Sequence, residues 1–455
     1  MIQFHKADGR ERFHSAESVL VLGFLAIILV GTVLLALPVA ARDGRSIGLF
    51  DSLFTATSAV CVTGLVAVDT GTTFSPFGQA VLILLIQVGG LGFMVFATMI
   101  MVMLGRRISL KGRMLIRESM NSASLSDLAG LARLYLFLAF GFELLGTGLL
   151  SVRFIPVYGL RRGLWMAFFH SVSAFCNAGF DLFGGYSSLT AFAHDPLVLL
   201  TVALLIVLGG LGFSVILEAL RNRQGFRGLS LHARIVLVLT PILLLAGTGF
   251  YMLAEWKNHG TLADLSTGDK LLNAFFQSVT MRTAGFNSFD LSQMKDGSKL
   301  FSGLLMMIGA SPASTGGGMK TTTVAVFVLL MVSAVKGEGE VNVAHRRFSG
   351  DVARRALAVV ALYLLILVIG TMAITLIEDG KFALSDVIFE TSSAMGTVGV
   401  SSIGTPNLQT SSRAVLLPMM FLGRIGPLTL AIAVARRQGN VRKLSKYPEE
   451  RIMIG

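Results

Sequence analysis

Four short segments of the chain share one pattern, in which small and hydroxyl-bearing residues lead to a single glycine. They are TATSAVCVTGL (55–65), HSVSAFCNAGF (170–180), FQSVTMRTAGF (276–286) and ETSSAMGTVGV (390–400). Their glycines, Gly64, Gly179, Gly285 and Gly399, are separated by 115, 106 and 114 residues, which indicates an internal repeat. Glycine permits a backbone that turns carbonyl oxygens inward, and four such loops around one axis could replace the hydration shell of a cation.

The residues before each glycine favour a hard monovalent cation, because the four loops carry no ring of carboxylates for calcium. A single helix–glycine–helix interruption is more often a kink or a packing contact, whereas recurrence in register favours an ion-coordinating loop. The predicted filter residues are Val62, Thr63, Gly64, Asn177, Ala178, Gly179, Thr283, Ala284, Gly285, Thr397, Val398 and Gly399.

The composition places these loops in a membrane. Of 455 residues, 53% are hydrophobic and 14% are charged, against about 25% charged residues in ordinary soluble domains. Uncharged runs long enough to cross about 30 Å of hydrocarbon occur at 18–41, 196–217, 235–254 and 356–377, and others lie within 70–105, 300–319 and 414–435. The first run exceeds the core of a signal peptide, so we predict a retained span, although LPVAA resembles a cleavage site.

The net charge of +12 is distributed over alternate loops. Basic residues gather at 105–128, 221–234, 336–355 and in the tail from 436, whereas most intervening loops are acidic or neutral. The positive-inside rule therefore predicts that the basic loops and both termini are cytoplasmic, and nucleic-acid binding is not needed to explain the charge. Arg153, Arg161 and Arg162 disagree, because they fall on the outer side.

Each glycine segment lies between two apolar runs, so each repeat is predicted to be a span, a short pore helix, a glycine loop and a returning span. The predicted fold is an all-α polytopic membrane protein with four pseudo-symmetric units around a single pore and eight spans. The predicted parts are a cytoplasmic N-terminus at 1–15, units at 16–105, 129–220, 233–336 and 352–436, and a cytoplasmic tail at 437–455.

The second span of the third unit is interrupted. Pro312 and three consecutive glycines cannot continue a helix, and irregular backbone at membrane depth must face a pore or other protein. A kink with packing glycines is the alternative. Arg424 lies inside the last apolar run, and we expect loop carbonyls to accept its hydrogen bonds, with snorkelling to the interface or a dimer contact as the alternative.

The signatures TSAVCVTGL, HSVSAFCNAGF, RTAGFNS, STGGGMK and GRIGPLTLA resemble the potassium-translocating subunits of the Trk/Ktr/HKT superfamily, and among them the membrane subunits of bacterial Ktr systems. The resemblance covers nearly the whole chain. It implies potassium at the filter carbonyls, a preference that Gly64 supports, since family members with Ser at that position tend toward sodium. It also implies an intramembrane gate, formed here by Gly309, Ala310, Ser311, Pro312, Ala313, Ser314, Thr315, Gly316, Gly317, Gly318, Lys320 and Arg424.

The same resemblance implies a homodimer in the bacterial inner membrane and a cytoplasmic KtrA-type ring of regulatory subunits. It assigns no cofactor to this chain, expects ATP or ADP on the partner ring, and suggests sodium as an activator. The regulatory ring and anionic lipid are both candidate partners for the basic cytoplasmic loops.

For the other ionisable residues inside the apolar runs, a structural role is favoured over a role in ion binding. Arg282 and Glu390 could pair and brace the filters, Glu143 needs a partner that the sequence does not name, and His170 is expected to be a satisfied structural histidine.

Three functions are compared: a gated potassium pore, a coupled secondary potassium transporter, and a membrane-embedded enzyme. Coupling normally needs carboxylates at mid-depth, and Glu143 is the one candidate. An enzyme would need a Ser–His pair or a metal cluster within the spans, and none of the seven histidines has HExxH spacing. The sequence therefore favours the pore and predicts no enzyme activity.

Overall fold

A computed structural model describes residues 16–92, 95, 128–337, 342–343, 346–347 and 350–437. The described part is helical apart from a two-residue antiparallel pairing of β1 (Asn342–Val343) with β2 (Arg346–Arg347). The predicted N-terminus at 1–15, the cytoplasmic half of the first unit's second span and the tail from 438 lie outside the described residues.

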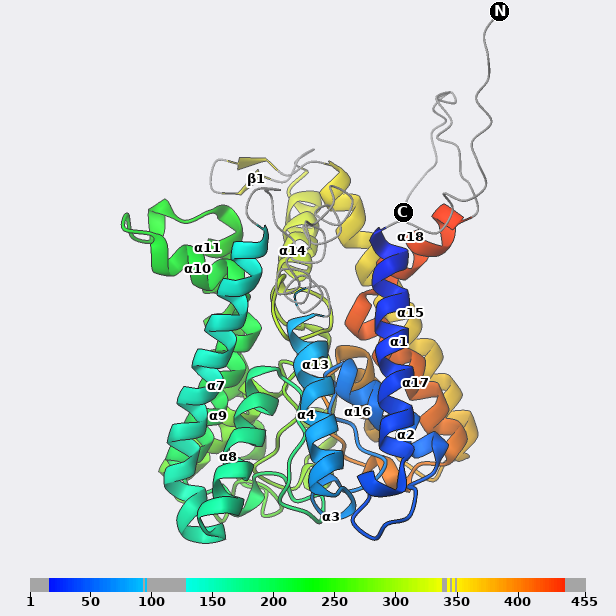
Figure 1. Ribbon diagram of the computed structural model, residues 1–455. Helices are drawn as coiled ribbons and strands as arrows, with labels where there is room; N and C mark the ends of the chain where they lie inside the picture. Colours follow the sequence, from blue (N-terminus) through cyan, green and yellow to red (C-terminus); the bar gives the residue numbers. More distant parts are fainter. Residues whose placement is uncertain are drawn as a thin grey trace, which may run out of the picture.

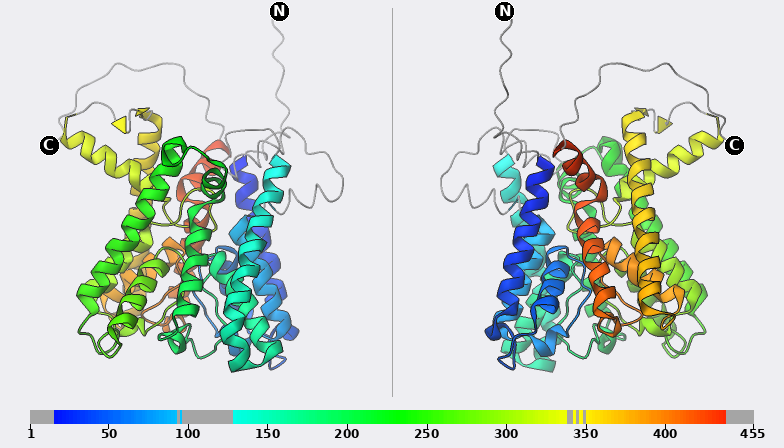
Figure 2. Two further views of the ribbon diagram at one scale, coloured as in Figure 1. Left: turned by 90° about the vertical axis from the view of Figure 1, so that its left-hand side faces the viewer. Right: turned by 90° about the vertical axis from the view of Figure 1, so that its right-hand side faces the viewer.

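Four helices in the described part are long and apolar enough to cross a membrane. They are α1 (Ala16–Ala36), α7 (Leu128–Tyr158), α11 (Leu231–Glu255) and α15 (Gly350–Glu378). All four run between the same two ends of the molecule (Figures 1 and 2). They expose many Leu, Val and Ile side chains, which suits surfaces that face lipid.

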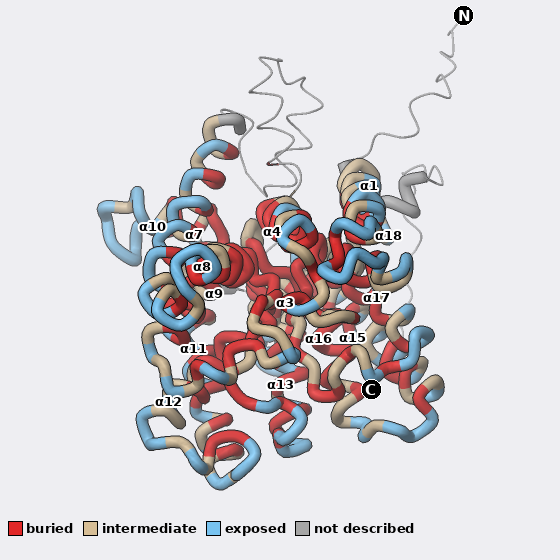
Figure 3. Tube along the Cα trace, turned by 60° about the horizontal axis from the view of Figure 1, so that its bottom comes forward, coloured by how far each residue is buried: buried red, intermediate tan, exposed pale blue. Residues whose placement is uncertain are grey.

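Four shorter helices, called the inner helices here, follow the long ones. They are α2 (Leu49–Val60), α8 (Leu160–Phe175), α12 (Thr267–Thr280) and α16 (Leu384–Gly396). Each packs on the long helix before it, and the second half of each is buried. Figure 3, seen from the end where the inner helices begin, shows this buried material at the centre of the molecule, surrounded by more exposed segments.

Four further helices, called the second helices here, leave the centre again. They are α4 (Pro76–Leu91), α9 (Pro196–Leu211), α13 (Asp296–Met307) and α17 (Thr410–Ile425). The side chains of Ser75 and Asp195 cap α4 and α9, and proline occupies the first turn of both, where its missing N–H costs no hydrogen bond. Short connections complete the described chain: α3 (Thr70–Thr73) and the 3₁₀ turns Pro38–Ala40, Thr190–Phe192, Phe226–Gly228, Leu291–Gln293 and Thr405–Asn407.

None of the second helices continues as one straight span within the described residues. α9 ends at Gly212, and α10 (Phe213–Arg221) starts there at an angle of 92°. α17 ends at Gly426 before α18 (Pro427–Arg437), and α13 resumes as α14 (Thr321–Val335) only after a loop. The predicted apolar runs at 196–217 and 414–435 each contain such a break, because Gly212 and Gly426 have φ of 91°, which a right-handed helix cannot contain.

Candidate functional site

The four glycine turns that follow the inner helices, at 62–64, 177–179, 283–285 and 397–399, have the same backbone. The first residue of each turn is left-handed, with φ of 49° at Val62, 57° at Asn177, 67° at Thr283 and 51° at Thr397. The glycines have φ of 92°, 70°, 88° and 97° in the same order. Left-handed β-branched residues are rare outliers, and such strain is characteristic of functional sites.

These turns form a closed ring. A Cβ added at Gly64 would lie 2.5 Å from the carbonyl oxygen of Ala178 in the next repeat. The same relation holds from Gly179 to Ala284 at 2.9 Å and from Gly285 to Val398 at 2.6 Å, and Gly399 closes the ring against the carbonyl oxygen of Thr63. Each glycine thus abuts the carbonyl that precedes the next glycine, and the ring has no room for a side chain at any of the four.

Hydroxyl groups of the inner helices hold the turns in place. The N–H groups of Gly64 and Gly399 donate to the Oγ atoms of Ser58 and Ser393, each at 3.0 Å. In the other two repeats the hydroxyl donates instead, from Ser173 to the carbonyl of Phe180 at 2.8 Å and from Thr280 to that of Phe286 at 2.6 Å. None of these four bonds uses a carbonyl that precedes a glycine of the ring.

The interrupted stretch of the third repeat, here called the central loop (309–320), lies directly against this ring. A Cβ at Gly316 would meet the hydroxyl of Thr283, and one at Gly317 would meet the hydroxyl of Thr397. Both hydroxyls belong to the first residues of glycine turns. The loop is closed on itself by Gly309 N to Met319 O at 2.8 Å and Ala310 N to Gly317 O at 3.2 Å.

Neighbouring repeats also hold the central loop. The N–H groups of Ser311 and Thr315 donate to the carbonyls of Gly210 and Gly209 at 3.0 and 3.1 Å, and that of Gly318 donates to Gly423 at 3.2 Å. A Cβ at Gly209 would lie 2.8 Å from the hydroxyl of Thr315, so the loop needs small residues around it. The Nζ of Lys320 donates to the carbonyl of Gly316 at 2.8 Å.

Arg424 joins the loop to the first repeat. Its guanidinium donates to the carbonyl of Thr315 and to those of Gly89 and Gly90, the last at 2.9 Å. Thr315 lies within 309–318, the loop whose carbonyls were expected from the sequence to accept hydrogen bonds from Arg424. The acceptors at the end of α4 were missed, because nothing in the sequence links two glycines to an arginine so far along the chain.

The expected pair of Arg282 and Glu390 does not form. The carboxylate of Glu390 accepts from the hydroxyls of Ser401 at 2.5 Å and Thr405 at 2.7 Å, so it fixes the chain just beyond its own glycine turn. Arg282 instead donates to the hydroxyl of Thr321, at the start of α14, at 3.4 Å. Charge in a sequence does not say where on a helix face each group points, and this hypothesis was wrong for that reason.

Glu143 and His170 both have neutral partners. The amide of Gln87 donates to Glu143 at 2.8 and 3.1 Å, which ties α4 to α7. A glutamine inside an apolar run was the signal that the sequence analysis missed. His170 Nδ1 lies 2.7 Å from the carbonyl of Met166, and its Nε2 accepts from the N–H of Leu182 at 3.3 Å, so the histidine is satisfied as expected.

Comparison with known proteins gives consistent matches over the whole chain. Residues 2–444 match the family model "TrkH: Cation transport protein". The chain is 40% identical to the Ktr system potassium uptake protein B of Bacillus subtilis over 96% of both chains, and 40% identical to that of Vibrio alginolyticus over 100% of both. It is 36% identical to the potassium/sodium uptake protein NtpJ of Enterococcus hirae, over 95% of this chain and 96% of that one.

The fold matches the crystal structure of the potassium transporter TrkH from Vibrio parahaemolyticus. The TM-score is 0.68 at 19% identity, covering 94% of this chain and 86% of that chain. The expectation of an all-helical membrane protein is confirmed by this likeness, as is the resemblance to the Ktr membrane subunits by the curated relatives. The chain therefore belongs to the TrkH family of cation transport proteins, and is a multi-pass membrane transporter and not an enzyme.

Proposed function

We propose that the chain takes up potassium through the ring of four glycine turns. The single observation that carries this is the cyclic contact of each glycine with the carbonyl preceding the next, which gathers the carbonyls of Thr63, Ala178, Ala284 and Val398 around one axis. Carbonyl oxygens in such a ring replace the hydration shell of a monovalent cation. Three of the relatives named above are potassium or potassium/sodium uptake proteins by name, which supports potassium as the cargo.

The central loop with Lys320 and Arg424 is proposed as the gate. This is supported by the place of the loop, which lies against the first residues of two glycine turns. Lys320 and Arg424 place two basic groups there, and positive charge on them would repel passing cations. Opening would require these hydrogen bonds to break.

The likeness to Ktr system proteins also supports a proposal about partners. We propose a homodimer in the inner membrane, with cytoplasmic termini and eight spans, and a KtrA-type ring that binds ATP or ADP and acts on the gate. Sodium dependence is proposed by analogy with the potassium/sodium relative. Cation-coupled symport is the second candidate. It is weakened by Glu143, whose carboxylate is held by Gln87 between α4 and α7 and forms no part of the glycine ring.

The test is rubidium-86 uptake into liposomes that carry the purified protein, driven by an internal potassium load. Wild type should take up rubidium, potassium should compete, and sodium and lithium should compete weakly. The variant lacking Gly316–Gly318 is measured alongside, because wild type without its partner ring can be closed. Absence of selective uptake by both folded proteins would contradict the proposal. An external pH dependence abolished by Glu143→Gln would favour symport.

A further inference from the structure

The outer ends of the repeats are joined by four polar contacts that run around the molecule. In each contact, a residue in the first turn of a second helix, or just before it, meets the first turns of the next repeat's inner helix. The pairs are Gln79 Oε1 with Trp165 Nε1 at 2.8 Å, His194 Nδ1 with Asp269 Oδ2 at 2.9 Å, Lys299 Nζ with Asp386 Oδ1 at 2.8 Å, and Arg413 Nη1 with Asp51 Oδ1 at 2.8 Å. Together they link repeats 1, 2, 3 and 4 and return to repeat 1.

Two of these contacts are ion pairs in matched register. Asp51 and Asp386 each stand thirteen residues before the glycine of their own turn, and Lys299 and Arg413 each stand fourteen residues after theirs. Each pair has one member in the fourth repeat. An ion pair therefore joins that repeat to each of its two neighbours. The second repeat is bounded instead by a neutral hydrogen bond and a histidine contact.

The contact between Lys299 and Asp386 is the best shielded of the three contacts that involve an ionisable pair. The side chain of Lys299 is 8% exposed and that of Asp386 is 19% exposed, whereas His194 is 69% exposed. Shielded pairs are screened little by salt, and removing one partner leaves an uncompensated charge. The carboxylate also lies in the first turn of α16, where the helix dipole favours a negative charge.

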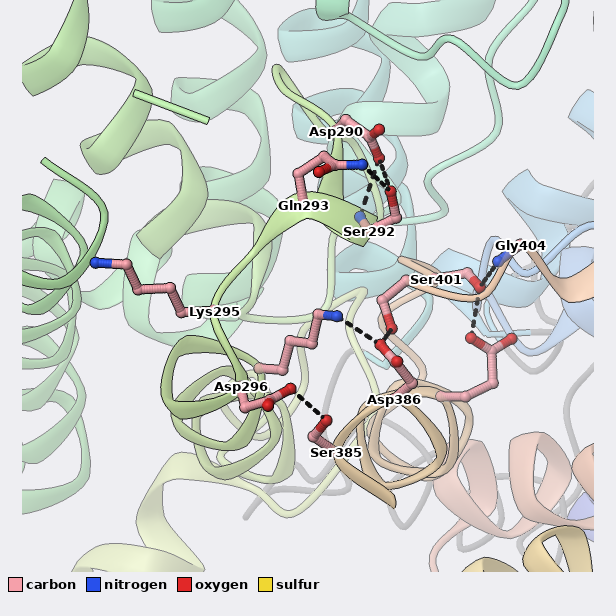
Figure 4. A network of polar contacts seen from close by, with 12 residues as sticks. Asp290, Ser292, Gln293, Lys295, Asp296, Ser385, Asp386, Ser401 and Gly404 are labelled. Carbon is pink, nitrogen blue, oxygen red and sulfur yellow. Dashed lines mark hydrogen bonds and ion pairs between the residues drawn. The ribbon is translucent and has the colours of Figure 1, made fainter. Parts of the chain in front are cut away.

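Asp386 contacts the chain just beyond the glycine turn of its own repeat. The hydroxyl of Ser402, three residues after Gly399, donates to the same oxygen of Asp386 at 2.7 Å. Next to it on α16, Ser385 donates to Asp296 of α13 at 2.7 Å, a second link across the seam (Figure 4). One helical turn further along, Glu390 holds Ser401, so two carboxylates of α16 fix the chain that leaves the fourth turn.

We propose that Lys299 and Asp386 are positioning residues for selectivity. Their ion pair sets where α16 stands against α13 and, through Ser402, where the carbonyls around Gly399 stand in the ring. This proposal rests on the proposed potassium uptake and adds residues that touch no ion. Arg413 and Asp51 perform the same task at the opposite seam of the fourth repeat.

The experiment uses the full-length chain in liposomes and compares wild type with Lys299→Met, Asp386→Asn and the double variant. The readout is the ratio of the sodium to the potassium concentrations that halve rubidium-86 uptake. Each single variant should lower this ratio about tenfold, the scale on which residues of a coupled network act. The double variant should be no worse than the worse single one, because all three remove the same contact. An unchanged ratio, or losses that simply multiply, would overturn the proposal.

Two further variants separate positioning from folding. Lys299→Arg keeps the charge and should retain most of the wild-type ratio. Ser402→Ala leaves the ion pair intact but cuts its link to the turn, and should lower the ratio about threefold with an unchanged thermal melt. If Lys299→Met does not fold, Ser402→Ala decides alone, and an unchanged ratio in that variant contradicts the proposal.

A matched control comes from the opposite end of the molecule. Arg354 and Asp351 form an ion pair at 2.6 Å with side chains 82% and 75% exposed. Arg354→Gln should leave the ratio unchanged. Wild type that takes up rubidium without preferring potassium over sodium would contradict the proposed function itself, whereas a selective wild type with indifferent seam variants would contradict only the positioning role.

Discussion

The four glycine turns have the same backbone conformation in every repeat, whereas the four breaks in the second helices do not. The turns share one backbone in spite of different residues, with positive φ at the first residue and at the glycine of each. The breaks follow two patterns. Gly92, Gly212 and Gly426 end their helices with φ of 83°, 91° and 91°, whereas the third repeat inserts the central loop between α13 and α14.

The difference shows where symmetry is required. A ring of carbonyls can surround an ion only if every repeat delivers its carbonyl at the same height and angle. The central loop needs only one copy, because four copies could not occupy the same space against the ring. One repeat therefore supplies the loop, and the others supply the small residues that receive it, such as Gly209 and Gly423.

The largest effect that tests this comparison should come from shortening the loop. Deletion of Gly316–Gly318 removes the backbone that lies against Thr283 and Thr397. We expect rubidium-86 uptake without a regulatory ring to rise by about tenfold or more, as for a population moved from closed to open. The order of preference among potassium, sodium and lithium should not change, since the ring is untouched.

Arg424→Gln is the companion variant for that experiment. It loses charge-assisted bonds to Thr315, Gly89 and Gly90 and should raise uptake less than the deletion does. Reduced uptake by both variants, in protein that still elutes as a single folded species, would contradict a gating role for the loop.

The next largest effect should come from the ring itself. Gly64→Ser places a Cβ against the carbonyl of Ala178 and puts an L-residue at φ of 92°, a conformation that costs about 1–2 kcal/mol. The carbonyls must move, and the preference for potassium over sodium should fall about tenfold. Competition of sodium against rubidium-86 uptake measures it.

Gly44→Ser is the matched control for this substitution. Gly44 also has a left-handed φ, of 71°, but a Cβ there meets none of the residues that the structure describes within 4 Å. It should carry a similar backbone strain without the clash and leave selectivity unchanged. Equal selectivity in the two variants would show that the ring does not select the ion.

The positions of the glycine turns could be predicted from the sequence because the signal is local and repeated. Hydroxyl-bearing residues such as Ser58 and Ser393 occupy the same place in the repeat, and both hold their glycine. The breaks at Gly212 and Gly426 could not be predicted, since an isolated glycine in an apolar run is usually tolerated within a helix. The partners of Arg282 and Glu143 depend on which helix faces meet, which a single sequence does not contain.

A smaller effect should distinguish two breaks that share one backbone. A Cβ at Gly212 would lie 2.5 Å from the carbonyl of Pro312 in the central loop, whereas a Cβ at Gly92 meets no described residue within 4 Å. Gly212→Ala should therefore disturb the central loop and raise rubidium-86 uptake about threefold when the regulatory subunits are absent. Gly92→Ala should leave that uptake unchanged. Both carry the same backbone strain, so equal uptake in the two variants would show that the contact with Pro312 has no part in closure.

The smallest effect is expected at the seam between the second and third repeats. The hydrogen bond from His194, followed by that from Ser266, lowers the pKa of the Asp269 carboxyl at the exposed start of α12. A lowered carboxyl pKa means that the contribution of this contact to stability is present above the usual pKa and is lost as the pH falls through the lowered one. The contact is well exposed, and Asn273 also holds the seam by donating to the carbonyl of Ala193 at 2.8 Å.

We therefore expect His194→Gln to change the competition of sodium against rubidium-86 uptake by less than about twofold at neutral external pH, because exposed pairs contribute little. The same measurement on Lys299→Met should give the much larger loss expected for a shielded pair. If the two variants lost selectivity equally, the burial of a contact would not determine its effect on selectivity. The ion pairs of the fourth repeat would then be no more important for selectivity than the exposed histidine contact. If His194→Gln alone lost it, the histidine contact of the second repeat would be the seam that positions the ring.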